Sequence, residues 1–298
     1  MKRRATGPTL FDLEGTAEAA AAKIERPYNL PGTGIHLGTS SFTSPGWAGS
    51  FYPAGMQNRE YLSYYATQFD TVEIDSTFYG TPVASTVSNW AQKTPADFVF
   101  AAKVPQTITH DKVLVNCEAE FDEFMERMNL LGAKLGPLVL QFPFFSRSVF
   151  RDANAFLARL RAFLKRARET TKARLAVEVR NKDWLNATLT EILREYDASL
   201  ALVDLSHMPR PWEIEKVECI TSDFVYIRWL GDRKGIEALT PSWDKPVVDR
   251  TNDMRAWVST VKQMVQERKV KHLFLFANNH YSGHAPSTVK LFWEIWKG

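Results

Sequence analysis

Residues Val72 to Gly80 read Val-Glu-Ile-Asp-Ser-Thr-Phe-Tyr-Gly, a short alternating run that ends in a turn. Because side chains alternate along a β-strand, Glu73 and Asp75 share one face of this strand and the apolar residues share the other. Two carboxylates on one face indicate either a solvated edge or the polar mouth of a sheet or barrel. Phe78 and Tyr79 follow immediately and would be costly to expose without a partner, which favours the mouth.

Seven further apolar runs resemble this one, since each ends in polar residues or glycine. The eight runs are Ile35–Thr39, Thr71–Asp75, Phe98–Ala102, Leu138–Phe142, Leu175–Val179, Leu200–Asp204, Val225–Trp229 and Leu273–Ala277. Segments with helical periodicity separate most of them. These segments are Tyr61–Phe69, Ser85–Gln92, Glu118–Leu131, Asn154–Arg168, Leu189–Tyr196, Met254–Arg268 and Thr288–Trp296.

Alternating strands and helices predict a parallel sheet, and eight units in about 260 residues match the size of a closed (β/α)8 barrel, the TIM-barrel class of α/β folds. A doubly wound open sheet is the alternative. The first strand-to-helix turn, Gly38 to Phe42, lacks the glycine spacing of a dinucleotide-binding fold. We therefore predict a single-domain barrel over residues 35–298. Residues 1–34 are interpreted as an N-terminal arm with a short helix over Ala17–Ile24, ended by a Pro- and Gly-containing segment.

Composition restricts the class of protein only mildly. The chain has 298 residues and a formal net charge of +3, which gives no bulk electrostatic indication of a nucleic-acid or membrane partner. Its two cysteines, Cys117 and Cys219, stand in no metal-binding spacing and are typical of a reducing compartment. No apolar stretch of membrane-spanning length follows the basic N-terminus. We expect a cytoplasmic protein with no membrane partner, and its oligomeric state is left open.

In a barrel the active site lies at the carboxyl ends of the strands, and polar residues follow every predicted strand here. The residues expected to meet at this mouth are Ser40, Glu73, Asp75, Lys103, Gln141, Glu178, Arg180, Asp204, Arg228, Asn278 and Asn279, with Tyr79 and His110 on the adjoining loops. The loop from Gly231 to Arg250, which contains Trp243, belongs to the same side and is long enough to serve a function.

The acids in this set are the candidate catalytic residues: Glu178, Glu73, Asp75 and Asp204. Neighbouring carboxylates can hold different protonation states and so supply acid/base chemistry. The competing interpretation is an ion-pair network with the nearby cations that neutralises buried charge. Candidate substrate-binding residues are Arg180, Arg228, Lys103, His110, Gln141, Asn278, Asn279, Ser40 and Tyr79. The cations among them indicate a small-molecule or phosphate-bearing ligand.

Cofactor signals are weak. The six histidines form no HxH or HExxH pattern, and therefore no transition-metal site and no organic cofactor are predicted. A Mg²⁺ ion held by the carboxylates is kept as an alternative.

Several motifs together resemble the DUF72 family of YecE-like proteins. They are Gly38-Thr39-Ser40, Phe51-Tyr52-Pro53, Val72 to Tyr79, Thr109-His110, Lys134-Leu135-Gly136, Gln141-Phe142-Pro143, Val177-Glu178-Val179-Arg180 and Phe276-Ala277-Asn278-Asn279. The resemblance implies a TIM-like barrel and no specific activity, since the family is itself uncharacterised. Two positions depart from its pattern: Asp75 stands where many members have Asn, and Arg228-Trp229-Leu230-Gly231 replaces an Arg-x-His-Gly turn.

The expected function is an enzyme, a hydrolase or an isomerase, that acts on a small phosphorylated or sugar-like substrate by carboxylate acid/base chemistry. Two alternatives stay open: a nucleic-acid-binding or nucleic-acid-processing barrel, and a ligand-binding protein without catalysis.

Overall fold

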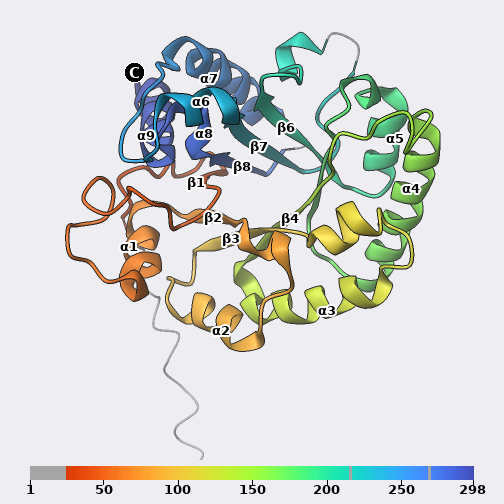
Figure 1. The fold of residues 1–298 in the computed structure, drawn as a ribbon, viewed down its shortest axis with the longest axis horizontal. Coiled ribbons are helices and arrows are strands. Elements are labelled where there is room, and N and C mark those ends of the chain that lie inside the picture. The colour runs from red at the N-terminus through yellow and green to blue at the C-terminus, as the bar shows by residue number, and fades with distance from the viewer. Residues whose placement is uncertain (1–24, 215–216, 268–269) are drawn as a thin grey trace, which may run out of the picture.

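The computed structural model describes residues 25–214, 217–267 and 270–298. The helix expected over Ala17–Ile24 lies outside these residues. Eight parallel strands form the centre of the molecule (Figure 1). They are β1 (Ile35–Thr39), β2 (Thr71–Ile74), β3 (Val99–Lys103), β4 (Leu135–Gln141), β5 (Leu175–Glu178), β6 (Ser199–Leu205), β7 (Phe224–Gly231) and β8 (His272–Ala277).

Helices form a ring around these strands (Figure 1). They are α1 (Tyr61–Gln68), α2 (Ala84–Gln92), α3 (Glu118–Met128), α4 (Ala153–Thr170), α5 (Ala187–Glu195), α6 (Arg233–Leu239), α7 (Thr251–Gln266), α8 (Asn279–Ser282) and α9 (Ala285–Lys297). Among the described residues, none of these helices combines the length and the apolar character needed to cross a membrane.

The strand order is β1-β8-β7-β6-β5-β4-β3-β2, and every neighbouring pair in this order is parallel and hydrogen-bonded. The barrel closes between β1 and β2 through side chains. The Leu37 amide donates to Asp70 Oδ1 at 3.0 Å, and the Thr39 amide donates to the Tyr65 hydroxyl at 2.8 Å. That hydroxyl in turn donates to the Thr71 carbonyl at 3.1 Å. A Cβ added to Gly38 would lie 2.1 Å from the same carbonyl oxygen, which explains why a glycine stands at this crossing.

Two apolar layers stabilise the barrel. Inside it, small and aromatic side chains from six strands form one cluster: Ala101, Val139, Ala176, Ala201, Phe224, Tyr226, Phe274 and Phe276. Outside it, the opposite faces of the strands pack against the surrounding helices in a much larger cluster. Strands buried on both faces read as nearly continuous apolar runs, and this is the pattern seen in the sequence.

The predicted barrel is confirmed, and all eight strands lie where the sequence indicated them to within a few residues. The loop expected over Gly231–Arg250 contains the helix α6, and the turn after β8 forms the short helix α8. The connection between β6 and β7 has only the 3-10 turn Pro211–Glu213 within its described part. This agrees with the helix-breaking prolines in that segment.

The described part of the N-terminal arm is fixed to the barrel. Arg26 is buried, donates from Nε to the Ala66 carbonyl at 2.8 Å, and pairs with both carboxylate oxygens of Asp97 at 2.8 Å. Leu30 forms a bridge with Ile35 at the start of β1. The arm therefore adds to the amino-terminal end of the barrel, opposite the expected site.

Candidate functional site

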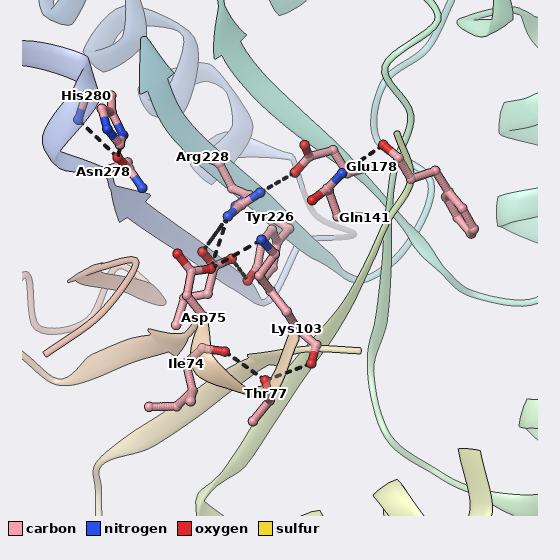
Figure 2. A network of polar contacts seen from close by, with 12 residues as sticks. Ile74, Asp75, Thr77, Lys103, Gln141, Glu178, Tyr226, Arg228, Asn278 and His280 are labelled. Atoms are coloured by element: carbon pink, nitrogen blue, oxygen red, sulfur yellow. Dashed lines mark hydrogen bonds and ion pairs between the residues drawn. The ribbon is translucent and has the colours of Figure 1, made fainter. Parts of the chain in front are cut away.

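The end of β2 is held in place by a hydroxyl group. After Ile74 the chain turns into the 3-10 segment Ser76–Tyr79. The Thr77 hydroxyl is within hydrogen-bond distance of two carbonyl oxygens, that of Ile74 at 2.9 Å and that of Lys103 at 2.7 Å. This side chain joins the carboxyl ends of β2 and β3 and so places Asp75 and Lys103 beside each other (Figure 2).

Arg228 lies at the centre of a buried ion-pair cluster that spans the barrel (Figure 2). Its Nη2 and Nε donate to Glu73 Oε1 at 2.8 and 3.2 Å, and its Nη1 donates to Glu178 Oε2 at 2.6 Å. The Tyr226 hydroxyl donates to the other oxygen of Glu73, and Arg180 donates from Nε to the other oxygen of Glu178 at 2.5 Å. Glu73 and Glu178 are fully buried, and all four of their oxygens accept a hydrogen bond.

The electrostatics of this cluster keep its ion pairs charged. Burial alone would raise the pKa of Glu178, but Arg180 and Arg228 outweigh burial and lower that pKa to about 2. Burial likewise opposes the charge on Arg228, yet Glu73 and Glu178 hold its pKa well above the ordinary value. Burial and the neighbouring Glu73 raise the pKa of Tyr226, which keeps its hydroxyl a donor. Glu178, Arg228 and Tyr226 are therefore each fixed in one protonation state at neutral pH.

Asp75 differs from the two glutamates. Its side chain is 33% exposed, and its Oδ1 lies 3.5 Å from Lys103 Nζ and 3.6 Å from Arg228 Nη2. Within the described structure Oδ1 is buried and has no hydrogen-bond partner. Desolvation raises the pKa of Asp75 to about 6, since Lys103 and Arg228 offset burial only in part and Glu73 adds repulsion. Asp75 is the carboxyl group of this cluster that can exchange a proton near neutral pH.

Lys103 and His110 form the side of the mouth next to Asp75. The Lys103 ammonium lies 4.6 Å from the centre of the Phe78 ring, and the His110 ring meets the edge of the same ring at 4.9 Å. His110 Nδ1 is 2.8 Å from the Thr109 hydroxyl. Burial, followed by the charge on Lys103, lowers the pKa of His110 and favours the neutral ring.

A cavity of about 200 Å³ opens on the opposite side of Asp75, over the ends of β1 and β8. Ser40 and Asn278 belong to its lining, and the Ser40 hydroxyl is buried without a partner among the described residues. Asn279 also reaches the lining, but its amide holds the structure together. It accepts from Trp47 Nε1 at 3.2 Å and donates to the Ser44 hydroxyl at 2.7 Å.

Two of the candidate residues do not join the cluster. Asp204 was expected at the mouth, but it points outward from β6 and accepts hydrogen bonds from Trp257 Nε1 at 2.7 Å, the Tyr281 hydroxyl at 2.9 Å and Arg210 Nε at 3.0 Å. Its neighbour Val203 pairs with Arg228, so that the alternation of the strand turns Asp204 toward the helices. Tyr79 lies on the rim with its side chain 79% exposed.

Gln141 occupies an intermediate place. It pairs in register with Glu178 on the neighbouring strand, and its amide donates to the Phe142 carbonyl at 2.8 Å (Figure 2). The candidates that the structure brings together around Asp75 are therefore Glu73, Glu178, Arg180, Arg228 and Lys103, with His110, Gln141, Ser40 and Asn278 around them.

Tyr226 is a member of the cluster that sequence reasoning did not single out. It stands two residues before Arg228 in the same predicted strand, and the period of two places both side chains on one face. That spacing was the available signal.

The arrangement of the carboxylate oxygens tests whether Glu73 and Glu178 could bind Mg²⁺, the alternative kept from the sequence. In the described part of the chain no group of three or more His, Cys, Asp or Glu side chains is arranged to hold a metal ion. The Arg228 guanidinium stands between the carboxylates of Glu73 and Glu178, where a shared cation would be bound. These two residues therefore do not form a Mg²⁺ site in this arrangement.

Comparison with known proteins gives the family. The family model described as "Protein of unknown function DUF72" matches residues 36–298. UPF0759 protein YecE of Escherichia coli K12 is 33% identical over 109 residues, which are 37% of this chain and 38% of that protein. UPF0759 protein YunF of Bacillus subtilis is 30% identical over 106 residues, 33% of this chain and 38% of that protein. The matched regions therefore span well under half the length of these curated relatives.

Crystal structures of DUF72 family proteins share the fold. One from Thermotoga maritima has a TM-score of 0.68 at 24% identity and covers 89% of this chain and 99% of its own. One from Enterococcus faecalis has a TM-score of 0.66 at 22% identity, with 89% and 96% covered. With the family model matching almost all of the barrel, the chain belongs to the DUF72 family.

Proposed function

We propose that this protein is an enzyme that transfers a proton to or from a small polar substrate at the barrel mouth, with Asp75 as the acid/base group. The observation that carries this proposal is the state of Asp75 Oδ1, which is buried and accepts no hydrogen bond within the described structure. Its contacts with Lys103 and Arg228 are long ion pairs, and the same carboxylate opens to a cavity. A carboxyl group with a pKa of about 6 suits proton transfer near neutral pH.

The other acids have supporting roles in this proposal. Glu73 and Glu178 are fully buried and use both of their oxygens on Arg228, Tyr226 and Arg180, so that proton transfer by either glutamate would disrupt a buried ion pair. They hold Arg228 and Arg180 in position. Asp204 accepts hydrogen bonds from Trp257 and Tyr281 and is given no catalytic role in this proposal.

Cations beside Asp75 indicate the charge of the substrate. Lys103 is 3.5 Å from Asp75, a long distance for a hydrogen bond, and its ammonium keeps donors for a ligand. Arg180 extends from β5 with its side chain 20% exposed. These groups suit a phosphorylated or acidic sugar-like substrate in a hydrolase or isomerase reaction. The free cysteines Cys117 and Cys219 support a cytoplasmic location as part of the same proposal.

The test is a turnover screen of the purified protein against phosphosugars, glycosides and nucleotides, with and without Mg²⁺, followed by Asp75→Asn on any active substrate. We expect the substitution to lower kcat/KM by about 10²- to 10⁴-fold, because it removes the proton-transfer group and keeps its shape. The wild-type pH profile of kcat/KM should show a limb near pH 6 that the variant lacks.

Asp183→Asn is the matched control, since Asp183 also follows a barrel strand, β5, but is exposed and outside the cluster. Its kcat/KM should equal that of the wild type. Full activity of Asp75→Asn would overturn the assignment. Ligand binding without turnover on the whole panel would favour a binding protein, and oligonucleotide binding that weakens steeply with salt would favour a nucleic-acid function.

A further inference from the structure

The cavity over β1 and β8 differs in chemistry from the rest of the mouth. Its described lining contains no Lys or Arg and is rich in hydroxyl and carboxamide groups: Thr39, Ser40, Ser41, Ser44, Asn278 and Asn279, with Trp47, Trp243, His280 and Asp75. Its volume of about 200 Å³ is far larger than the roughly 10–15 Å³ that one water needs. A polar cavity of this size has room for part of a ligand.

One buried group in the cavity wall lacks a partner. The Ser40 side chain is 3% exposed, its backbone amide donates to the Ala277 carbonyl at 2.9 Å, and its hydroxyl has no hydrogen bond among the described residues. An unpaired buried hydroxyl costs free energy, which a hydrogen bond from a ligand would recover. On the adjacent strand end, Asn278 uses its carbonyl oxygen on the His280 amide at 3.0 Å and has donors remaining on its nitrogen.

Two loops bring an aromatic side chain to the same cavity. Gly46 in the β1–α1 loop has φ +87, and a Cβ there would lie 2.9 Å from the Trp243 backbone nitrogen in the loop between α6 and α7. This close approach sets Trp243 in the cavity wall, where its half-buried indole also meets the edge of His280 at 4.8 Å. An indole beside hydroxyl and amide groups is a surface on which a sugar ring can pack.

We infer that this cavity, whose described lining holds no Lys or Arg, is a subsite for the hydroxyl-bearing part of the substrate, and that the substrate is a sugar carrying one anionic group. The sugar hydroxyls lie against Ser40, Asn278 and Trp243, and the anionic group lies toward Lys103 and Arg180 on the other side of Asp75. Figure 2 shows this division, with Asn278 on one side of Asp75 and Arg228 and with Glu178 on the other. This inference rests on the proposed function, which puts the reacting part of the substrate beside Asp75.

Binding is the direct test. We would titrate pentoses and hexoses, each as free sugar, aldonic acid and phosphate ester, and inorganic phosphate alone, by calorimetry. All further substitutions are made in the Asp75→Asn protein, called the host, so that substrate turnover does not disturb the binding measurement. The anionic sugars should bind more tightly than the free sugars. Adding Ser40→Ala should weaken their binding roughly fivefold to tenfold, and adding Trp243→Ala about tenfold, with phosphate binding unchanged. Lys103→Met should weaken phosphate and anionic sugars and spare free sugars.

Ser50→Ala is the control, because Ser50 lies on the same loop as Gly46 but its hydroxyl is exposed and donates to the Gly46 carbonyl. The preference between acids and phosphate esters then identifies the anionic group. Equal sugar affinity in the host with and without Ser40→Ala and Trp243→Ala would overturn the inference, as would no binding by any sugar. Sugar binding that depends on Ser40 with no turnover in the wild type would overturn the proposed function alone.

Discussion

Arg228 is buried with its side chain 2% exposed, and it bridges two carboxylates that are themselves inaccessible to water. Taking three charges out of water is costly, and the cost is offset only while every ion has its partners. The cluster is therefore a demanding arrangement in which each member depends on the others. Its place at the strand ends means that the same residues shape the site and affect the stability of the barrel.

Replacing Arg228 by Met should lower the free energy of unfolding by about 3–5 kcal/mol, because Glu73 and Glu178 would remain buried without a counter-ion. Urea unfolding at pH 7 measures the change. The triple variant with Glu73→Gln and Glu178→Gln should recover part of the loss, since it removes both unpaired charges.

Arg233→Met is the control for that measurement. Arg233 is 76% exposed and pairs with Glu237 four residues along its helix, a contact that contributes little in water. Its free energy of unfolding should stay within about 0.5 kcal/mol of the wild type. A loss of less than 1 kcal/mol in Arg228→Met would contradict the role given to the cluster.

At the scale of elements, the junction of β1 and β2 is the weakest part of the barrel wall, because these strands are not neighbours in the hydrogen-bonded order. Tyr65 in the helix α1 and Asp70 just after it accept the hydrogen bonds of the β1 amides that a neighbouring strand would otherwise accept. Tyr65 is fully buried, and burial raises the pKa of its hydroxyl above the ordinary value, so that the group stays protonated at physiological pH. The Tyr65 part of the closure is therefore a relay of neutral hydrogen bonds between the Thr39 amide and the Thr71 carbonyl.

Tyr65→Phe should destabilise the protein by about 1–3 kcal/mol, since it leaves the Thr39 amide and the Thr71 carbonyl buried without their partner. Thermal unfolding gives the total effect, and hydrogen exchange of the Thr39 amide should quicken if the junction opens locally.

Tyr64→Phe removes a hydroxyl from the adjacent, half-buried position of the same helix and is the matched control. We expect it to leave both measurements near wild type. Equal effects of the two substitutions would show that the Tyr65 hydroxyl does not close the barrel.

Over the whole molecule, the two ends of the barrel respond to pH with opposite signs. At the mouth, the pKa of Asp75 is raised from 3.8 to about 6, and therefore the stability that it contributes is present below pH 3.8 and is lost as pH rises through 6. At the opposite, amino-terminal end of the strands, His272 Nδ1 lies 3.4 Å from His36 Nε2. The other ring nitrogen of His36, Nδ1, lies 2.8 Å from Asp70 Oδ2. Burial lowers the pKa of His272, which makes the folded state less stable as pH falls through 6.5.

Unfolding curves between pH 4 and pH 8 should separate the two ends. Asp75→Asn should gain stability relative to wild type as pH rises from 4 to 8, because the costly charged form is removed. His272→Gln should instead gain relative to wild type as pH falls from 7 to 5. Asp183→Asn and His207→Gln are the controls, because both side chains are exposed. A constant difference for Asp75→Asn would contradict its raised pKa.

From the resemblance to DUF72 we expect that many members have Asn at the position of Asp75, and this expectation bears on the pH effect. A chain with Asn there would lack the titrating group. The proton transfer proposed here is accordingly a property of this chain and of relatives that keep the carboxylate.

Much of the architecture could be predicted from local patterns. The run from Thr71 to Asp75 and its seven counterparts were recognisable because buried parallel strands are apolar on both faces and end where polar residues begin. That one pattern also explains the error at Asp204. In the β6 run Ser-Leu-Ala-Leu-Val-Asp-Leu, apolar residues occupy both faces, and nothing local tells which face the acid shares.

The sequence by itself determined the barrel, its strand ends and the residue types gathered at its mouth, because these depend on short-range alternation. Only the tertiary structure decided which acids are held in close hydrogen-bonded ion pairs and which one, Asp75, has only long ion pairs. Tyr226 and Arg228 meet Glu73 across 153 and 155 positions of sequence. Such partners are set by closure of the whole barrel. Closure pairs Glu73 and Glu178 with arginines, and it leaves Asp75 and Ser40 facing the cavity.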